Sequence, residues 1–178
     1  GTWSIENGNI TVKAGETGND VTQNNVTTKN DTNTIITNQN KDIASSNTVT
    51  IETNDKNDKV EVTLKDVNID TSSRNKAAVS VTGEGDTNIK LDGDNALKSD
   101  IYRSGIYGSG IGSLTIYGGE NDSLTAKGGS GADGSGGDGI HSGSLTIYGG
   151  TVNANGGNCG DGNYSDGGSG IRISSHSL

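Results

Sequence analysis

Apolar residues occupy every second position in a series of short segments along the chain. The apolar–polar–apolar triplets are residues 62–64, 67–69, 79–81, 89–91, 114–116, 124–126, 145–147 and 152–154. A period of two is typical of a strand that buries one face. Most segments are bounded by Gly, Asn, Asp or Ser, which favour turns, and none shows a capped 3.6-residue apolar stripe. The pattern therefore predicts an all-β protein.

An internal repeat indicates how these strands are arranged. The sequence SLTIYGG occurs at residues 113–119 and again at 144–150, an offset of 144 − 113 = 31 residues. A unit that stacks on copies of itself must recur at a nearly fixed period. When the strands are grouped in threes, each group forms one coil of a right-handed single-stranded parallel β-helix, a solenoid of about four to five coils. The right hand is expected because parallel crossovers nearly always have it.

The repeat also predicts three stacked columns of inward-facing residues. The first contains Leu64, Leu91, Ile116 and Ile147. The second contains Ile69, Leu97, Ala126 and Ala154. The third contains Val81, Ile106, Ile140 and Ile171, three of which follow a glycine in a recurring Gly-Ile pair. Each coil of such a solenoid depends on its neighbours for burial.

We expect residues 1–178 to form one domain, in which residues 1–59 are a less regular N-terminal coil or cap. The triplets 10–12 and 49–51 and the pair 35–36 fit an earlier coil, and Trp3 is expected to cover the open end of the core. At the other end, residues 170–178 resemble 139–145 and stop where another SLTI strand would begin. The chain is therefore expected to be a fragment of a longer protein.

Composition agrees with a thin, elongated core. The 178 residues are 27% hydrophobic and include 30 glycines and no proline. Regular β-branched alternation argues against disorder, which low apolar content alone would permit. The formal charge of −9 argues against binding to nucleic acid or to anionic membranes, and there is no long apolar run for membrane insertion. The single cysteine, Cys159, excludes a disulfide within the chain.

Several phrases between Val60 and the C-terminus carry a family resemblance. They are VTLKDVNID at 62–70, AAVSV at 77–81, IKLDGDNAL at 89–97 and the two SLTIYGG units. In this order they resemble the secreted bacterial proteins described as carbohydrate-binding domain-containing. The resemblance implies a right-handed parallel β-helix related in fold to pectate lyases, a location outside the cell or on its surface, and polysaccharide binding.

Tyr117 and Tyr148 follow the inward residues Ile116 and Ile147, so both side chains are expected to point outward on adjacent coils, about 4.8 Å apart along the stack. A pair of exposed aromatic rings suits the C–H face of a sugar and its hydroxyl groups. We therefore assign these two tyrosines as the candidate carbohydrate-binding residues. The alternative is a structural aromatic ladder.

The glycine-rich loops contain a second repeat, in which Asp133 and Asp138 recur as Asp161 and Asp166 at an offset of 28 residues. Stacking would bring these carboxylates together, where they need solvent or a cation. Oxygen-only ligands favour calcium, so the sequence predicts a Ca²⁺ site formed by these four residues. A solvated acidic loop is the alternative.

Enzyme signatures are sparse. His141 and His176 lie far apart with no paired nucleophile motif, and no GxSxG sequence occurs. The preferred interpretation is a non-catalytic, secreted or cell-surface module that binds a polysaccharide. The runner-up is a structural stalk or adhesin shaft that spaces other domains from the cell surface. An ice-binding solenoid is less favoured, because its threonine array would be interrupted by Lys90.

Overall fold

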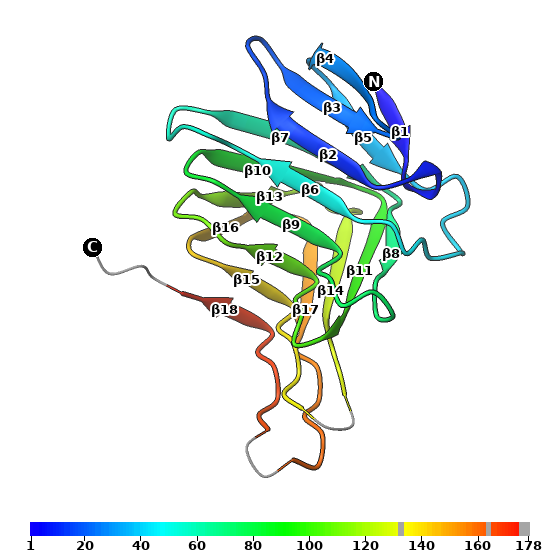
Figure 1. The fold of residues 1–178 in the computed structure, drawn as a ribbon, viewed down its shortest axis with the longest axis vertical. Coiled ribbons are helices and arrows are strands. Elements are labelled where there is room, and N and C mark those ends of the chain that lie inside the picture. Colours follow the sequence, from blue (N-terminus) through cyan, green and yellow to red (C-terminus); the bar gives the residue numbers. More distant parts are fainter. Residues whose placement is uncertain (132–133, 163–164, 175–178) are drawn as a thin grey trace.

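A computed structural model of the chain describes residues 1–131, 134–162 and 165–174. These residues form a parallel β-solenoid of about five turns, with the N-terminus at one end of the stack and the last coil at the other (Figure 1). The described residues contain a single helical element, the short 3-10 turn η1 (Ile5–Asn7). None of their helices is long and apolar enough to span a membrane. The all-β solenoid predicted from the sequence is confirmed.

Three sheets run along the stack, with one strand from each full coil. Sheet 1 contains, in order, β1 (Thr2–Ser4), β5 (Thr34–Thr37), β7 (Lys59–Lys65), β10 (Asp86–Asp92), β13 (Leu114–Tyr117) and β16 (Leu145–Tyr148). Sheet 2 contains β8 (Asn68–Asp70), β11 (Asp94–Ile101), β14 (Ser123–Gly129) and β17 (Thr151–Asn155). Sheet 3 contains β4 (Val26–Asp31), β3 (Asn19–Gln23), β2 (Ile10–Ala14), β6 (Val49–Glu52), β9 (Val79–Thr82), β12 (Ile106–Gly108), β15 (Ile140–Ser142) and β18 (Ile171–Ile173).

The first 59 residues extend the same stack. β1 and β5 pair in parallel in sheet 1, and β2 and β6 pair in parallel in sheet 3. On the side of sheet 2, η1 and a single bridge from Ser45 to Ile69 take the place of strands. The strands β3 and β4 are antiparallel additions to the edge of sheet 3, and they were not predicted from the sequence. β3 covers the N-terminal end of the core, where Val21 is fully buried, whereas the residues of β4 are exposed or half-buried.

The second predicted column is correct, since Ile69, Leu97, Ala126 and Ala154 are successive partners in sheet 2. The first column is wrong by two residues at one step. Ile116 is aligned with Ile89 and Val62, whereas Leu91 is aligned with Leu64. Ile147 does follow Ile116.

The third column has the same kind of error. Ile106 pairs with Val79, and Val81 pairs with Gly108, while Ile140 and Ile171 follow Ile106 as predicted. A shift of two residues leaves the same face inward, so alternation alone cannot exclude it. All the predicted column residues up to Ile140 are buried, whereas Ile147 and Ile171 in the last coil are 39% and 44% exposed.

The glycine-rich loops after β14 and β17 run together and extend beyond the sheets (Figure 1). Their backbones are in direct contact: the Gly157 N–H donates to the Gly137 carbonyl at 2.8 Å, and the Gly168 N–H donates to the Gly157 carbonyl at 2.9 Å. A Cβ placed on Gly168 would lie 1.8 Å from the Gly137 carbonyl oxygen. Close approach of backbones, rather than flexibility, therefore explains the glycine content of these loops.

Candidate functional site

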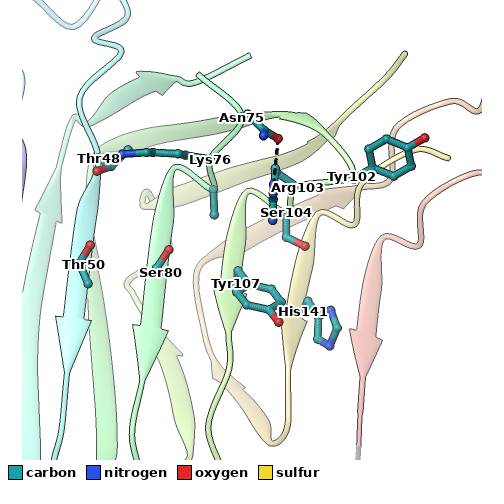
Figure 2. Close-up of a pocket in the computed structure, with 11 residues that line it drawn as sticks. Thr48, Thr50, Asn75, Lys76, Ser80, Tyr102, Arg103, Ser104, Tyr107 and His141 are labelled. Carbon is teal, nitrogen blue, oxygen red and sulfur yellow. Dashed lines mark hydrogen bonds between the residues drawn. The ribbon is translucent and has the colours of Figure 1, made fainter. Parts of the chain in front are cut away.

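A groove of about 530 Å³ lies over the outer face of sheet 3. Its floor is a column of outward side chains on four consecutive strands, which alternate with the buried residues of the core. These are Thr50 on β6, Ser80 on β9, Tyr107 on β12 and His141 on β15. Because neighbouring strands are about 4.8 Å apart, the column is about 14 Å long. Figure 2 shows these four residues side by side beneath the loops that form the rim.

Two loops between sheet 2 and sheet 3 form the rim, and each carries a cation, Lys76 in one and Arg103 in the next. Lys76 precedes Val79 by three residues, and Arg103 precedes Ile106 by three. Since Val79 and Ile106 are partners in sheet 3, the two cations occupy the same step of successive coils. The groove therefore has a repeated positive position on one side.

Buried hydroxyl groups hold these two loops in place. The Thr71 hydroxyl donates to the Lys76 carbonyl at 2.6 Å, and the Ser99 hydroxyl donates to the Arg103 carbonyl at 2.6 Å. Thr71 and Ser99 are both fully buried. Thr71 follows Asp70 and Ser99 follows Lys98, and Asp70 and Lys98 are partners in sheet 2. The same kind of hydroxyl-to-carbonyl hydrogen bond therefore positions both cations.

The rim loops are also tied to each other. The Asp100 carboxylate accepts hydrogen bonds from the backbone N–H of Asn75 and of Ile101, both at 2.8 Å. Arg103 Nε donates to Asn75 Oδ1 at 3.1 Å (Figure 2). Asn75 and Tyr102 have φ angles of 53° and 62°, the left-handed region in which asparagine is common and tyrosine is not. This conformation leaves the Tyr102 side chain 60% exposed at one end of the groove.

The aromatic part of the floor is one edge-to-face pair. The ring centroids of Tyr107 and His141 are 5.2 Å apart, and their planes are inclined at 81°. Tyr107 is 40% exposed, so much of its ring remains open to the groove. Edge-to-face packing favours one orientation of the ring over others. The site thus presents an oriented aromatic surface beside hydroxyl, amide and cationic groups.

His141 is held from the far side of the groove by residues of the last two coils. Its Nδ1 lies 3.5 Å from Asp138 Oδ2, and its Nε2 shares a hydrogen bond with the Ser174 hydroxyl at 2.9 Å. The order carboxylate, imidazole, hydroxyl resembles that of a hydrolase triad. However, Asp138 Oδ2 accepts a 2.9 Å hydrogen bond from Arg172 Nε, and Oδ1 accepts one from the Ser169 N–H at 2.8 Å. We therefore interpret the cluster as a link between coils that also orients His141.

The structure places Tyr117 and Tyr148 next to each other in the register of sheet 1, as the sequence predicts. The two side chains differ in their surroundings. Tyr148 is 67% exposed, whereas Tyr117 is half-buried. Burial, hydrogen bonding to Glu61 and the negative charge of Glu61 together raise the pKa of the Tyr117 phenol to about 12. Tyr117 adjoins Lys90 of the preceding coil, rather than Asp92 as the first-column alignment implied.

The predicted calcium ligands are not gathered in the described part of the chain. Asp133 lies outside the described residues. Asp138 is buried against Arg172, whereas Asp161 and Asp166 are exposed. Among the described residues there is no group of three or more His, Cys, Asp or Glu side chains arranged to hold a metal ion. The calcium site therefore stays a prediction.

The alignment of the two acidic loops also differs from the sequence-based one. The 28-residue offset holds where Lys127 pairs with Asn155 (155 − 127 = 28), but it becomes 31 where Ile140 pairs with Ile171 (171 − 140 = 31). Three additional residues in the last loop cause this change. As a result, Asp138 lies beside Ser169 rather than opposite Asp166.

Sequence reasoning did not identify the groove, although one signal was present. The recurring Gly-Ile pair marks the inward position of sheet 3, so the next residue must face outward. At the three pairs that lie in sheet 3 that residue is Tyr107, His141 and Arg172, whereas the fourth pair, Gly110-Ile111, lies between strands. Lys76 and Arg103 lie in loops of irregular sequence, where no periodicity marks them.

Comparison with known proteins adds no identification: no family model matches the chain, and no curated protein or solved structure is significantly similar to it. The resemblance to carbohydrate-binding domain-containing proteins therefore stays a prediction from the sequence phrases.

Proposed function

We propose that the protein is a non-catalytic polysaccharide-binding module whose binding site is the groove over sheet 3. The observation that carries this proposal is the floor column of Thr50, Ser80, Tyr107 and His141, which repeats at the strand spacing across four coils. A regular row of hydroxyl and aromatic groups matches a polymer of similar units better than a compact ligand does.

Tyr107 is the central residue of this proposal. Its partly exposed ring offers an apolar surface for the C–H face of a sugar, and its hydroxyl group adds a polar edge. Sheet 1 offers a weaker aromatic surface, because Tyr117 is half-buried and only Tyr148 is widely exposed. A polysaccharide ligand also implies a location outside the cell or on its surface, as the resemblance to secreted proteins does.

The test is affinity electrophoresis of the purified chain through gels that contain individual soluble polysaccharides, both neutral and acidic. At least one should retard the wild type, and Tyr107→Ala should weaken binding to it by at least about fivefold. Tyr148→Ala is the matched control, because it removes an exposed tyrosine from a different sheet. Retardation by no polysaccharide, or equal losses in both variants, would contradict the proposal. The structural stalk would then be the better interpretation.

A further inference from the structure

The charge of the groove is opposite to that of the chain. The whole protein carries a formal charge of −9, yet the groove is lined by Lys76 and Arg103, and by no aspartate or glutamate among the described residues. Lys76 and Arg103 are exposed, and neither forms an ion pair in the part of the chain that the structure describes. Two positive groups are therefore available at the rim.

Carboxylates on the elements around the groove are bound to other groups. Glu52, two residues beyond Thr50 on β6, pairs with Lys13 at 3.2 Å. Asp100 accepts hydrogen bonds from the backbone of Asn75 and Ile101, and it lines a different pocket from the groove. Asp138 is bound to Arg172 and to the backbone of Ser169. None of these carboxylates forms an ion pair with Lys76 or Arg103 in the described part of the chain, so both cations are free to contact an incoming anion directly.

We propose that the ligand is an acidic polysaccharide, whose carboxylate or sulfate groups bind Lys76 and Arg103 while a sugar ring packs on Tyr107. This inference rests on the proposed polysaccharide binding and specifies the class of polysaccharide. The two cations recur at the same position of successive coils, beside the floor column that crosses the same coils, so one polymer can contact both the cations and the floor. The guanidinium of Arg103 suits a planar carboxylate or a sulfate, and Lys76 supplies a mobile point charge.

The overall negative charge does not prevent this binding. At physiological ionic strength the screening length is about 8 Å, so acidic residues on other faces act weakly at the groove. Charged groups in direct contact are screened much less. The local charges of the rim therefore decide which polymer binds, and the surrounding acidic surface disfavours polyanions elsewhere on the molecule.

The experiment compares three probes at about 150 mM salt: polygalacturonate, which carries carboxylates, dextran sulfate, which carries sulfates, and uncharged dextran. Wild type should bind at least one charged probe at least about tenfold more tightly than dextran. The double variant Lys76→Gln/Arg103→Gln should lose at least about tenfold in affinity for that probe and retain its melting temperature. The probe that binds identifies the anion.

The matched control is Lys98→Gln/Lys127→Gln, which removes two exposed cations that are partners in adjacent strands of sheet 2. It should bind the charged probe as wild type does. Equal losses in the two double variants, or equal affinity of wild type for a neutral and an acidic probe, would overturn the acidic-ligand proposal while leaving polysaccharide binding intact. Binding to no polysaccharide, charged or neutral, would instead contradict the proposed function itself, and this inference with it.

Discussion

Tyr107 and His141, 34 residues apart in the sequence, meet edge to face on adjacent strands of sheet 3 with ring centroids 5.2 Å apart. The imidazole supports one side of the tyrosine ring, and Asp138 and Ser174 hold the imidazole. The orientation of the aromatic surface in the groove therefore depends on contacts with the last two coils. His141 acts in this arrangement as a positioning residue for Tyr107.

Replacement of His141 by alanine should weaken polysaccharide binding by about two- to tenfold, because an edge-to-face pair contributes about 0.5–1.5 kcal/mol. Tyr107→Ala should have the larger effect. Both affinities can be measured by the same gel retardation. Ser174→Ala keeps the ring pair but removes one contact that holds the imidazole, so its loss should be smaller than that of His141→Ala. A loss in His141→Ala equal to that in Tyr107→Ala would show that the imidazole contacts the ligand directly.

Core substitutions should depend on position in the stack. Ile116 is fully buried between Ile89 and Ile147, so Ile116→Ala should lower the free energy of unfolding by about 2–5 kcal/mol. Ile147 is 39% exposed in the last coil, so the same substitution there should cost about 1 kcal/mol or less. Urea denaturation of the two variants measures the difference. If Ile116→Ala and Ile147→Ala lowered the free energy of unfolding equally, the side chain of Ile147 would have to be covered in solution.

The Thr87 hydroxyl is buried without a hydrogen-bond partner among the described residues. It lies between Val60 and Leu114. Thr87→Val keeps the shape and removes the unpaired group, so it should raise the free energy of unfolding by about 1 kcal/mol. Thr34→Val is the contrasting control and should destabilise, because that buried hydroxyl bonds Asn19 and Asp31. A less stable Thr87→Val variant would show that the hydroxyl has a partner in solution.

The Asp122 carboxyl should make the free energy of unfolding depend on pH in acid. Hydrogen bonds from the backbone N–H of Gly119 and of Gly93, with a smaller effect of the Lys90 charge, lower the pKa of its carboxyl below the ordinary value. A lowered folded-state pKa adds stability that is present above the unfolded pKa of about 3.9 and disappears as the pH falls through the folded value. The stability difference between wild type and Asp122→Ala should therefore be constant near neutral pH and shrink below about pH 4.

Urea denaturation between neutral and acid pH checks this prediction. Glu120→Ala, a change at an exposed residue of the same turn, is the control and should show no such dependence. A difference between wild type and Asp122→Ala that persists in strong acid would contradict the assignment.

The calcium site predicted from the acidic loops can be tested by thermal unfolding. If Asp133, Asp138, Asp161 and Asp166 hold Ca²⁺, calcium should raise the melting temperature relative to a chelator by mass action, and Asp161→Asn should abolish the shift. Asp42→Asn, at an exposed acid outside these loops, is the control. Equal melting temperatures in calcium and in chelator would contradict the site and leave the Asp138–Arg172 ion pair as the loop's charge compensation.

Alternation along the chain by itself determined the all-β class and which side chains face the core. It did so because a strand exposes its two faces at a period of two, whatever strand it pairs with. The SLTIYGG repeat added the solenoid, and it aligned Ile116 with Ile147 correctly because both lie in identical units. The sheet 2 column from Ile69 to Ala154 followed in the same way.

Only the tertiary structure decided the strand register where the repeats are imperfect. It also decided which residues come together in the groove. A two-residue slip leaves the same face buried, so the pattern cannot distinguish Ile89 from Leu91 as the neighbour of Ile116. Three additional residues in the last loop likewise placed Asp138 beside Ser169 instead of Asp166. Lys76 and Arg103 line the same rim because stacking places loops 27 residues apart in successive coils (103 − 76 = 27), a proximity that no local pattern encodes.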